Sequence, residues 1–216
     1  MNLKAQIDNL LRERNFESLV RLCEKERHAW QEVKYRLYSL DEVIRWSAIE
    51  ITGKLMEYWW KKGDEEKVRV YIRTLFWSMN DESGGIGWSS PQTVAEIISN
   101  IPEIIDPYGS MMIAHCIDEP PLIKGCLWGI GRLGVLIADS VEFFKNQIFE
   151  IFNSQDPEII GLACWAMGRT KFILSKSYVE KNIFIDNQIK IYINGKFIEK
   201  PVSFWAKEAL ANFEYA

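Results

Sequence analysis

The sequence predicts an all-α protein of about five stacked helix pairs, with a small β-hairpin near its C-terminal end. Three observations support this class: a segment that recurs along the chain, amphipathic stretches between its copies, and an alternating pattern around Asn194-Gly195. The 216 residues are 48% hydrophobic and 26% charged, which suits one globular domain or a short repeat array.

The recurring segment has three copies, at residues 41–54, 119–132 and 156–169. The last two begin with an acid followed by Pro and end in Trp-x-x-Gly-Arg in the same register. The copy at 41–54 keeps the Asp start, a small central residue, and a Gly followed by a base. Self-similarity of this kind is typical of helical repeat proteins.

The order of residues within this segment predicts a helix. Asp41 and Asp156 are suited to cap the helix by accepting from its first N–H groups, and Pro157 fits the first turn. The glycines near the end are expected to allow a close helix crossing or a C-terminal cap. These glycines are Gly53, Gly131 and Gly168.

The rest of the chain supplies the partner helices. Weaker copies start at Ser90-Pro91 and at Pro201, and apolar spacing predicts further helices. These helices are expected at about 3–12, 16–26, 28–38, 64–79, 103–115, 138–153 and 171–181. We therefore expect one domain over 1–216, with capping helices in 1–40, repeats in 41–181, a hairpin over 188–200 and a last helix over 201–214.

The hairpin is predicted from residues 189–193 and 196–200, which alternate in polarity on either side of Asn194-Gly195. This dipeptide is a strong signal for a two-residue turn. Because an isolated hairpin is marginally stable, we expect it to pack on the helices and to cover the exposed end of the array.

The Asp-Pro to Gly-Arg segment resembles the second helix of a HEAT repeat, of the type found in phycobilisome-lyase-like repeats. That resemblance implies a right-handed α-α superhelix, a HEAT-like solenoid whose second helices line the concave face. The segment N-D-E-S-G-G-I-G-W at residues 80–88 and the hairpin also resemble an uncharacterised HEAT-like family of anaerobic bacteria and archaea. That family implies a fold and no established activity.

Composition argues against some partners. The net charge of −4 provides no general field that attracts DNA or anionic membranes. No apolar run is long enough to span a membrane, and we expect the first residues not to act as a signal peptide. The four cysteines are far apart, which indicates reduced thiols and a cytoplasmic location; they are Cys23, Cys116, Cys126 and Cys164.

Catalytic and metal motifs are not evident. The two histidines, His28 and His115, have no ligand spacing around them, and C-x-x-C and G-x-S-x-G are missing. We therefore predict no catalytic residue, metal or cofactor. We expect a binding protein rather than an enzyme. Asn80, Asp81 and Glu82 offer oxygens to a hard cation, but without the alternating spacing of a calcium loop.

The strongest binding candidate is a strip of Trp and Arg on the second helices. Trp128 and Trp165 occupy equivalent positions, and Arg132 and Arg169 follow four residues later on the same helix face. Such a strip can anchor a protein partner or stack bases and flat ligands. The equally weighted alternative is that the Trp rings fill the space between repeats. The candidate set also includes Glu50, Trp77, Asn80, Asp81, Glu82 and Trp88.

Three functions remain open on this evidence. The leading interpretation is a non-enzymatic scaffold that binds another protein on its concave Trp/Arg-lined face. The first alternative is nucleic-acid binding or DNA-glycosylase-like chemistry, which rests on analogy of fold and which the acidic balance disfavours. The second is a lyase or chaperone for a tetrapyrrole or other cofactor, suggested by the repeat type. A membrane partner is not expected.

Overall fold

The computed structural model describes residues 2–80 and 87–214. The chain divides into two compact units, Met1–Ile101 and Pro102–Ala216. Both units are built from helices, and the second also carries a two-stranded antiparallel sheet. The expectation of one continuous domain over 1–216 stays a prediction.

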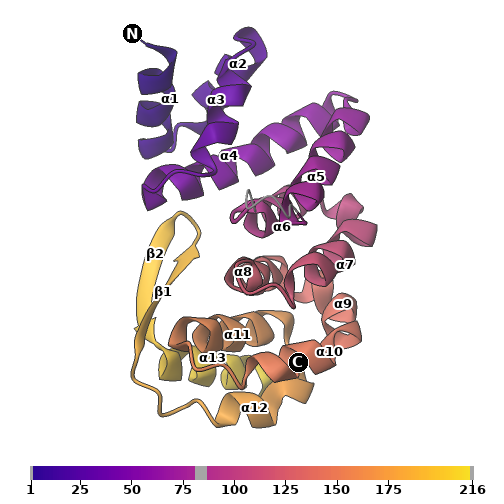
Figure 1. Cartoon of the computed structure of the whole chain (residues 1–216), viewed down its shortest axis with the longest axis vertical. Coiled ribbons are helices and arrows are strands. Elements are labelled where there is room, and N and C mark those ends of the chain that lie inside the picture. Colours follow the sequence, from indigo (N-terminus) through magenta and orange to yellow (C-terminus); the bar gives the residue numbers. More distant parts are fainter. Residues whose placement is uncertain (1, 81–86, 215–216) are drawn as a thin grey trace. The chain divides into compact units, whose positions relative to one another are not determined.

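The first unit is organised around one long helix. Its helices are α1 (Leu3–Arg12), α2 (Phe16–Lys25), α3 (Ala29–Arg36), α4 (Glu42–Lys61), α5 (Glu65–Met79) and α6 (Ser90–Asn100). All the others pack against α4 (Figure 1). Fully buried Ile49, Ile51, Leu55 and Met56 of α4 form the centre of this unit's core.

The second unit stacks its longer helices. It contains α7 (Ile105–Cys116), α8 (Ile123–Leu133), α9 (Ala138–Phe143), α10 (Lys145–Ile151), α11 (Pro157–Thr170), α12 (Lys176–Glu180), β1 (Gln188–Ile193), β2 (Lys196–Pro201) and α13 (Val202–Glu214). Short 3-10 turns span Pro102–Ile104, Gly134–Ile137 and Ile173–Ser175. Helix α11 lies between α8 and α13 and packs on both (Figure 1).

The five predicted helix pairs are confirmed. They are α3/α4 and α5/α6 in the first unit, and α7/α8, α9–α10/α11 and α12/α13 in the second. The helix expected over 138–153 is divided at Phe144, and the one expected over 171–181 starts as a 3-10 turn. Helix α8 begins only at Ile123, after a turn in which the Leu122 N–H donates to the Glu119 carbonyl at 2.9 Å. Pro121 disfavours a helical conformation at Pro120 before it.

The predicted caps are present. Asp41 Oδ1 accepts hydrogen bonds from the N–H groups of Val43 (3.0 Å) and Ile44 (3.2 Å), and Asp156 Oδ1 accepts from Glu158 (2.9 Å). Each capping carboxylate also pairs with a base from an earlier helix. Asp41 lies 2.6 Å from Arg12 Nη2, and Asp156 lies 2.9 Å from Lys124 Nζ. The caps therefore join helices as well as starting them.

The repeated glycines allow close crossings, one of the two predicted roles. A Cβ on Gly53 of α4 would lie 2.8 Å from Glu96 Cγ of α6, and a Cβ on Gly168 of α11 would lie 2.6 Å from the Ala209 Cα of α13. A Cβ on Gly131 of α8 would overlap the Trp165 ring of α11. At this equivalent position in each repeat, the lack of a side chain thus lets the second helix of the next repeat approach closely.

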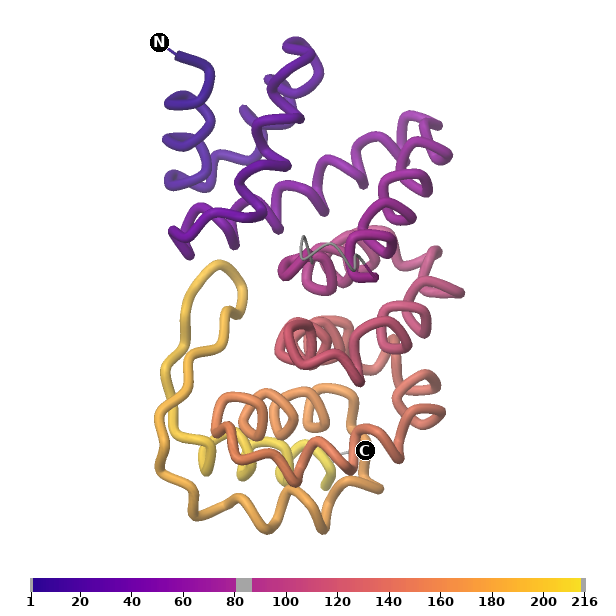
Figure 2. Tube along the Cα trace, viewed as in Figure 1, coloured from indigo at the N-terminus to yellow at the C-terminus, as the bar shows by residue number. Residues whose placement is uncertain are grey.

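The hairpin forms where it was predicted but packs elsewhere. Asn194 (φ 49°) and Gly195 (φ 83°) both have positive φ, as a type I′ turn requires. Instead of covering the end of the array, β1 packs on α11, where Gly161 leaves room for the Ile189 side chain. Figure 2 shows the hairpin returning beside α11, although α12 separates the two along the chain.

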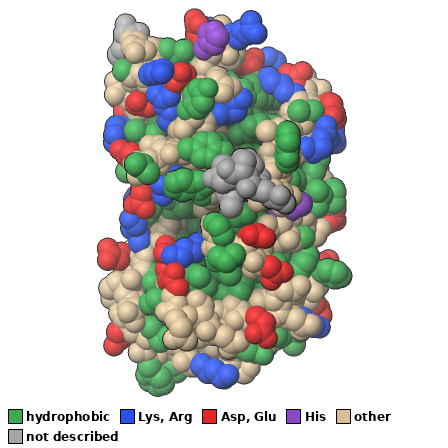
Figure 3. All heavy atoms as spheres, in the orientation of Figure 1, with side chains coloured by type: hydrophobic (Ala, Val, Ile, Leu, Met, Phe, Trp, Pro, Cys, Tyr) green, Lys and Arg blue, Asp and Glu red, His purple; other side chains and the backbone are tan. Residues whose placement is uncertain are grey.

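The length of the apolar helices and the distribution of surface charge bear on membrane and nucleic-acid partners. None of the described helices is both long and apolar enough to cross a membrane. On the face shown in Figure 3, acidic and basic side chains are interspersed among hydrophobic ones, with no large area of a single sign. This distribution matches the small net charge of −4.

Candidate functional site

Trp128 and Trp165, the predicted centre of the binding strip, are both interior residues. Their exposed fractions are 5% and 6%. The Trp128 indole N–H donates to the Tyr192 carbonyl of β1 at 2.7 Å, and the Trp165 ring lies against Gly131 of the preceding repeat. Both rings therefore fill space inside the second unit, which is the alternative that the sequence weighted equally with binding.

The arginines of the strip lie at the edge of this packing. Arg169 is exposed, and its Nε lies 3.4 Å from the Gly131 carbonyl, which links α11 back to α8. Arg132 is half-buried. Burial raises the pKa of Glu208 on α13, while nearby Arg169 lowers it. The structure thus brings Arg169 close to an acid of the next helix.

Glu50 is engaged inside the first unit. Its carboxylate forms a double ion pair with Arg14, of which the Nη2–Oε1 distance is 3.1 Å. Arg14 has a positive φ of 53° and its guanidinium lies 5.0 Å above the Phe16 ring. This contact fixes the α1–α2 turn against α4, which is a structural role.

Trp77, Asn80 and Trp88 remain at the surface. Trp77 is 78% exposed and Trp88 is 56% exposed. Next to them, the Gly87 N–H donates to the Ser78 carbonyl at 2.9 Å, and this bond brings residue 87 close to the end of α5. Asp81 and Glu82 lie outside the described residues, so the cation hypothesis stays a prediction.

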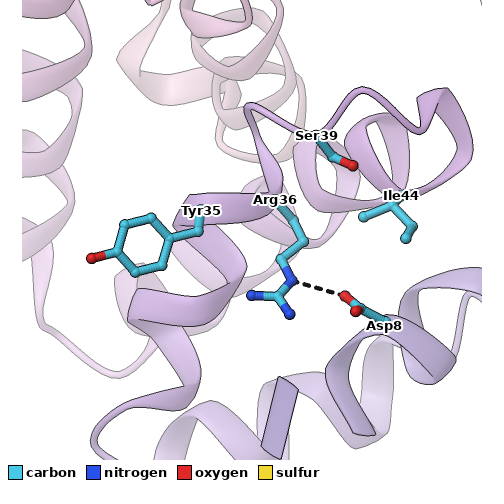
Figure 4. A pocket seen from close by; sticks show the side chains of 5 residues that line it. All are labelled: Asp8, Tyr35, Arg36, Ser39 and Ile44. Atoms are coloured by element: carbon cyan, nitrogen blue, oxygen red, sulfur yellow. Dashed lines mark hydrogen bonds and ion pairs between the residues drawn. The ribbon is translucent and has the colours of Figure 1, made fainter. Parts of the chain in front are cut away.

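A surface pocket that the sequence analysis did not identify lies in the first unit (Figure 4). Its volume is about 280 Å³, and Asp8, Tyr35, Arg36, Ser39 and Ile44 line it. These residues come from α1, α3, the connection after α3 and the start of α4. In Figure 4 the Arg36 side chain reaches toward Asp8, whereas the Tyr35 ring projects away from this pair.

The charged floor of the pocket is internally satisfied. Arg36 Nε donates to Asp8 Oδ1 at 2.8 Å, Nη1 pairs with the Glu32 carboxylate, and Nη2 donates to the Lys4 carbonyl at 3.3 Å. Burial lowers the Arg36 pKa, but the hydrogen bonds that Arg36 donates to Asp8 and Glu32 outweigh burial and raise that pKa overall. Arg36 therefore holds α1 and α3 together as a permanent cation.

Exposed apolar side chains flank this pocket. Leu40 is 86% exposed, Tyr35 is 59% exposed and Val43 is 45% exposed. We call the group formed by Asp8, Tyr35, Arg36, Ser39, Leu40, Val43 and Ile44 the α3–α4 surface. Exposed apolar side chains beside a hollow are characteristic of protein-binding surfaces.

One sequence signal points to this surface. Leu40 immediately precedes the capping residue Asp41, a position from which an apolar side chain commonly packs on the fourth residue of the helix. Here that residue is Arg45, which offers no apolar side chain. Leu40 is therefore left outside the core. No sequence signal places Asp8 at the pocket, and only the folded structure shows that it lies there.

The thiols do not form a reactive centre. All four cysteines are buried and free. Burial raises the pKa of Cys23 and of Cys164 to about 12, and a hydrogen bond with Cys116 together with burial raises that of Cys126. The thiols of Cys23, Cys126 and Cys164 are therefore protonated at neutral pH and are poor nucleophiles. Across residues 2–80 and 87–214, no three His, Cys, Asp or Glu side chains gather as a metal site requires.

Solved structures share the fold at low sequence identity. A designed armadillo repeat protein in complex with the peptide (KR)4 aligns over 97% of this chain and 91% of its own, with a TM-score of 0.61 and 16% identity. Computationally designed armadillo repeat proteins for modular peptide recognition align over 98% and 93%, with a TM-score of 0.53 and 16% identity. These likenesses agree with a helical repeat solenoid of the HEAT and armadillo class.

Sequence comparison identifies the family of this chain through a relative. No family model matches the chain, so the finer resemblance to phycobilisome-lyase-type repeats stays a prediction. An uncharacterised protein of Archaeoglobus fulgidus is 31% identical over 135 residues, which cover 61% of this chain and 68% of the relative. At this identity and coverage, the chain belongs to the same protein family as that Archaeoglobus fulgidus protein.

Proposed function

We propose that this protein is a non-enzymatic scaffold that binds another protein through the α3–α4 surface. The observation that carries the proposal is the exposed apolar group of Tyr35, Leu40 and Val43 beside a pocket of about 280 Å³. Exposing these side chains in the free protein is unfavourable, and covering them with a partner removes that cost.

The fold supports this kind of function. Helical repeats generate extended surfaces on which partners lie, and the designed armadillo proteins similar to this chain bind or recognise peptides. Trp128 and Trp165 are less suited to contact a partner than the concave-strip hypothesis requires, because both rings are already covered. The α3–α4 surface replaces them as the proposed contact.

The pocket indicates how a partner would be anchored. Its lining combines Tyr35 and Ile44 with Ser39 and the Asp8–Arg36 ion pair, and Arg36 already uses its donors within the unit. An apolar or aromatic side chain of the partner would fill the hollow between Tyr35 and Ile44, and its backbone could use the Ser39 hydroxyl. Aromatic anchors in pockets of this kind commonly dominate binding energy.

The test compares two double variants of the full chain. Tyr35→Ala/Leu40→Ala removes the exposed rim, whereas Val135→Ala/Phe143→Ala removes exposed apolar side chains of the second unit, 58% and 80% exposed in the native protein. Partners captured from an extract of the source cells would be identified, purified and titrated against both variants. We expect the first variant to weaken binding about 30-fold or more, equivalent to roughly 2 kcal/mol for a dominant anchor.

The control variant should bind the partner as the native protein does. Because all four substituted side chains are exposed, each variant should keep its helical content, which circular dichroism would check. A purified partner that binds Tyr35→Ala/Leu40→Ala with unchanged affinity would rule out this surface. Failure to capture any specific partner would argue against the scaffold function itself.

A further inference from the structure

The β-hairpin has one occupied edge and one open edge. In the observed register, Ile193 pairs with Lys196, Ile191 with Ile198, and Ile189 with Lys200. Because a two-residue turn connects the strands, these are the pairs whose N–H and C=O groups bond each other. The backbone groups of Phe197 and Glu199 on β2 therefore point away from β1.

An observed contact confirms this assignment on the other strand. By the same rule, the backbone groups of Tyr192 on β1 point away from β2, and the Tyr192 carbonyl indeed accepts the Trp128 indole N–H at 2.7 Å. Trp128 of α8 thus occupies the outer edge of β1 at Tyr192. At the outer edge of β2, no hydrogen bond from residues 2–80 or 87–214 reaches the backbone of Phe197 or Glu199.

The side chains of β2 determine which strand can pair there. Lys196, Ile198 and Lys200 share one face of the strand, and Phe197 and Glu199 share the other. Lys196, Glu199 and Lys200 are exposed, and Ile198 is half-buried. An antiparallel strand lying along β2 would place its own residues directly opposite these side chains.

A second copy of this chain is a poor occupant. The two antiparallel registers that overlap most put Lys196 opposite Lys200, or Glu199 opposite Glu199 of the other copy. Like charges directly opposite each other in a sheet are destabilising. The exposed lysines thus discourage self-association, which is a common way to protect an edge strand, and they favour a partner of opposite charge.

We propose that the outer edge of β2 binds an extended segment of a protein partner in which two acidic residues flank an apolar one in the pattern acid-x-apolar-x-acid. The two acids would lie opposite Lys200 and Lys196, and the apolar residue opposite Ile198. The backbone of the segment would bond that of Phe197 and Glu199, adding a third strand to the sheet. This site shares no residue with the α3–α4 surface, and its test does not depend on that surface.

The probe is the fluorescein-labelled peptide Thr-Glu-Lys-Ile-Val-Glu-Thr, titrated with the full chain and followed by fluorescence anisotropy. Its Lys and Val would lie opposite Glu199 and Phe197. The matched control, Thr-Lys-Glu-Ile-Val-Lys-Thr, has the charges exchanged and should bind at least tenfold more weakly. The variant Lys196→Glu/Lys200→Glu should reverse this preference, whereas Lys176→Glu/Lys207→Glu, which changes exposed charges away from the hairpin, should keep it.

Peptide methylation separates strand pairing from simple charge attraction. N-methyl groups on the Lys and Val of the probe remove the N–H groups that would face β2, and binding should be lost. An N-methyl group on its Ile points away from β2 and should leave the affinity within about twofold. The Tyr35→Ala/Leu40→Ala variant should bind the probe normally, so the two proposals fail or succeed independently.

Three results would overturn the proposal: no anisotropy change at millimolar protein, equal binding of the two charge patterns, or equal binding of the two methylated probes. The charge-reversed variant must retain the hairpin, which slow amide exchange at Ile191 and Ile198 would show. If that variant loses the hairpin, the methylated probes on the native protein decide the question alone.

Discussion

Gly131 shows how one residue can set the distance between two helices. The Trp165 ring occupies the space that a Cβ at this position would need, and the ring is only 6% exposed. An alanine would favour the helix by about 1 kcal/mol through its lower backbone entropy. A rigid aromatic ring cannot yield as the end of a flexible side chain can, so the clash outweighs this gain.

We therefore predict that Gly131→Ala lowers the free energy of unfolding by about 1–3 kcal/mol, the usual cost of overpacking. Urea denaturation of the full chain would measure it. The double variant Gly131→Ala/Trp165→Leu should lose less than the sum of the single changes, because the smaller side chain relieves the clash. Additive losses would show that Gly131 does not set the spacing of α8 and α11.

Asp156 links residue charge to helix stability. Burial acts to raise its pKa, but the hydrogen bonds from Lys124 and from the Glu158 N–H outweigh burial and lower it from its ordinary value of 3.8. A carboxylate whose pKa is lowered on folding contributes stability above its unfolded pKa. That contribution is lost as the pH falls through the folded pKa.

The variant Asp156→Asn isolates the charge, because Asn is an equally good capping residue. We expect it to be less stable than the native protein at pH 7 by at most about 1 kcal/mol, since the ion pair is partly exposed. The difference should shrink as the pH is lowered below 3.8. Chemical denaturation at pH 7 and pH 2.5 would measure both values, and a difference that does not change with pH would contradict this account.

At the scale of elements, the bond from the Trp128 indole to the Tyr192 carbonyl links the hairpin to α8. We predict that Trp128→Phe, which removes the bond to Tyr192 while keeping an aromatic ring, costs about 1 kcal/mol. It should also speed amide exchange in residues 188–201 more than in α7 or α10. Hydrogen-exchange mass spectrometry resolves these segments.

Trp205 offers the matched control for this prediction. Its ring is 2% exposed, and its indole nitrogen has no hydrogen-bond partner among the described residues. Trp205→Phe removes an unsatisfied donor rather than a bond, so stability should be unchanged or slightly increased. A similar loss in both variants would indicate that ring size, not the Tyr192 bond, determines the effect.

Local signals predicted the elements well and the site poorly. Asp41, Asp156 and Asn194-Gly195 each determine a cap or turn through neighbours a few residues away, so the sequence alone is sufficient for them. Trp128 suits an interface and a core equally, and only the position of β1 decides between these roles. The α3–α4 surface requires the ion pair between Asp8 of α1 and Arg36 of α3. No pattern in the sequence predicts that these two residues are in contact.

At the scale of the whole molecule, the division near residue 101 raises a question of cooperativity. Each unit has its own buried core, with Leu55 fully buried in the first and Leu127 fully buried in the second. Repeat proteins often open in parts, because each repeat contacts mainly its neighbours. The predicted single domain would instead open as one cooperative unit.

We predict that the two units open separately. Leu55→Ala and Leu127→Ala should each destabilise their own unit by about 2–5 kcal/mol, the usual cost of truncating a buried leucine. Native-state hydrogen exchange should then quicken at the slowest amides of α4 and α6 in the first variant, and at those of α8 and α11 in the second. If either substitution quickens exchange equally in both sets of helices, the chain opens as one unit. A partner bound to the α3–α4 surface would then stabilise the hairpin of the second unit as strongly as it stabilises α4.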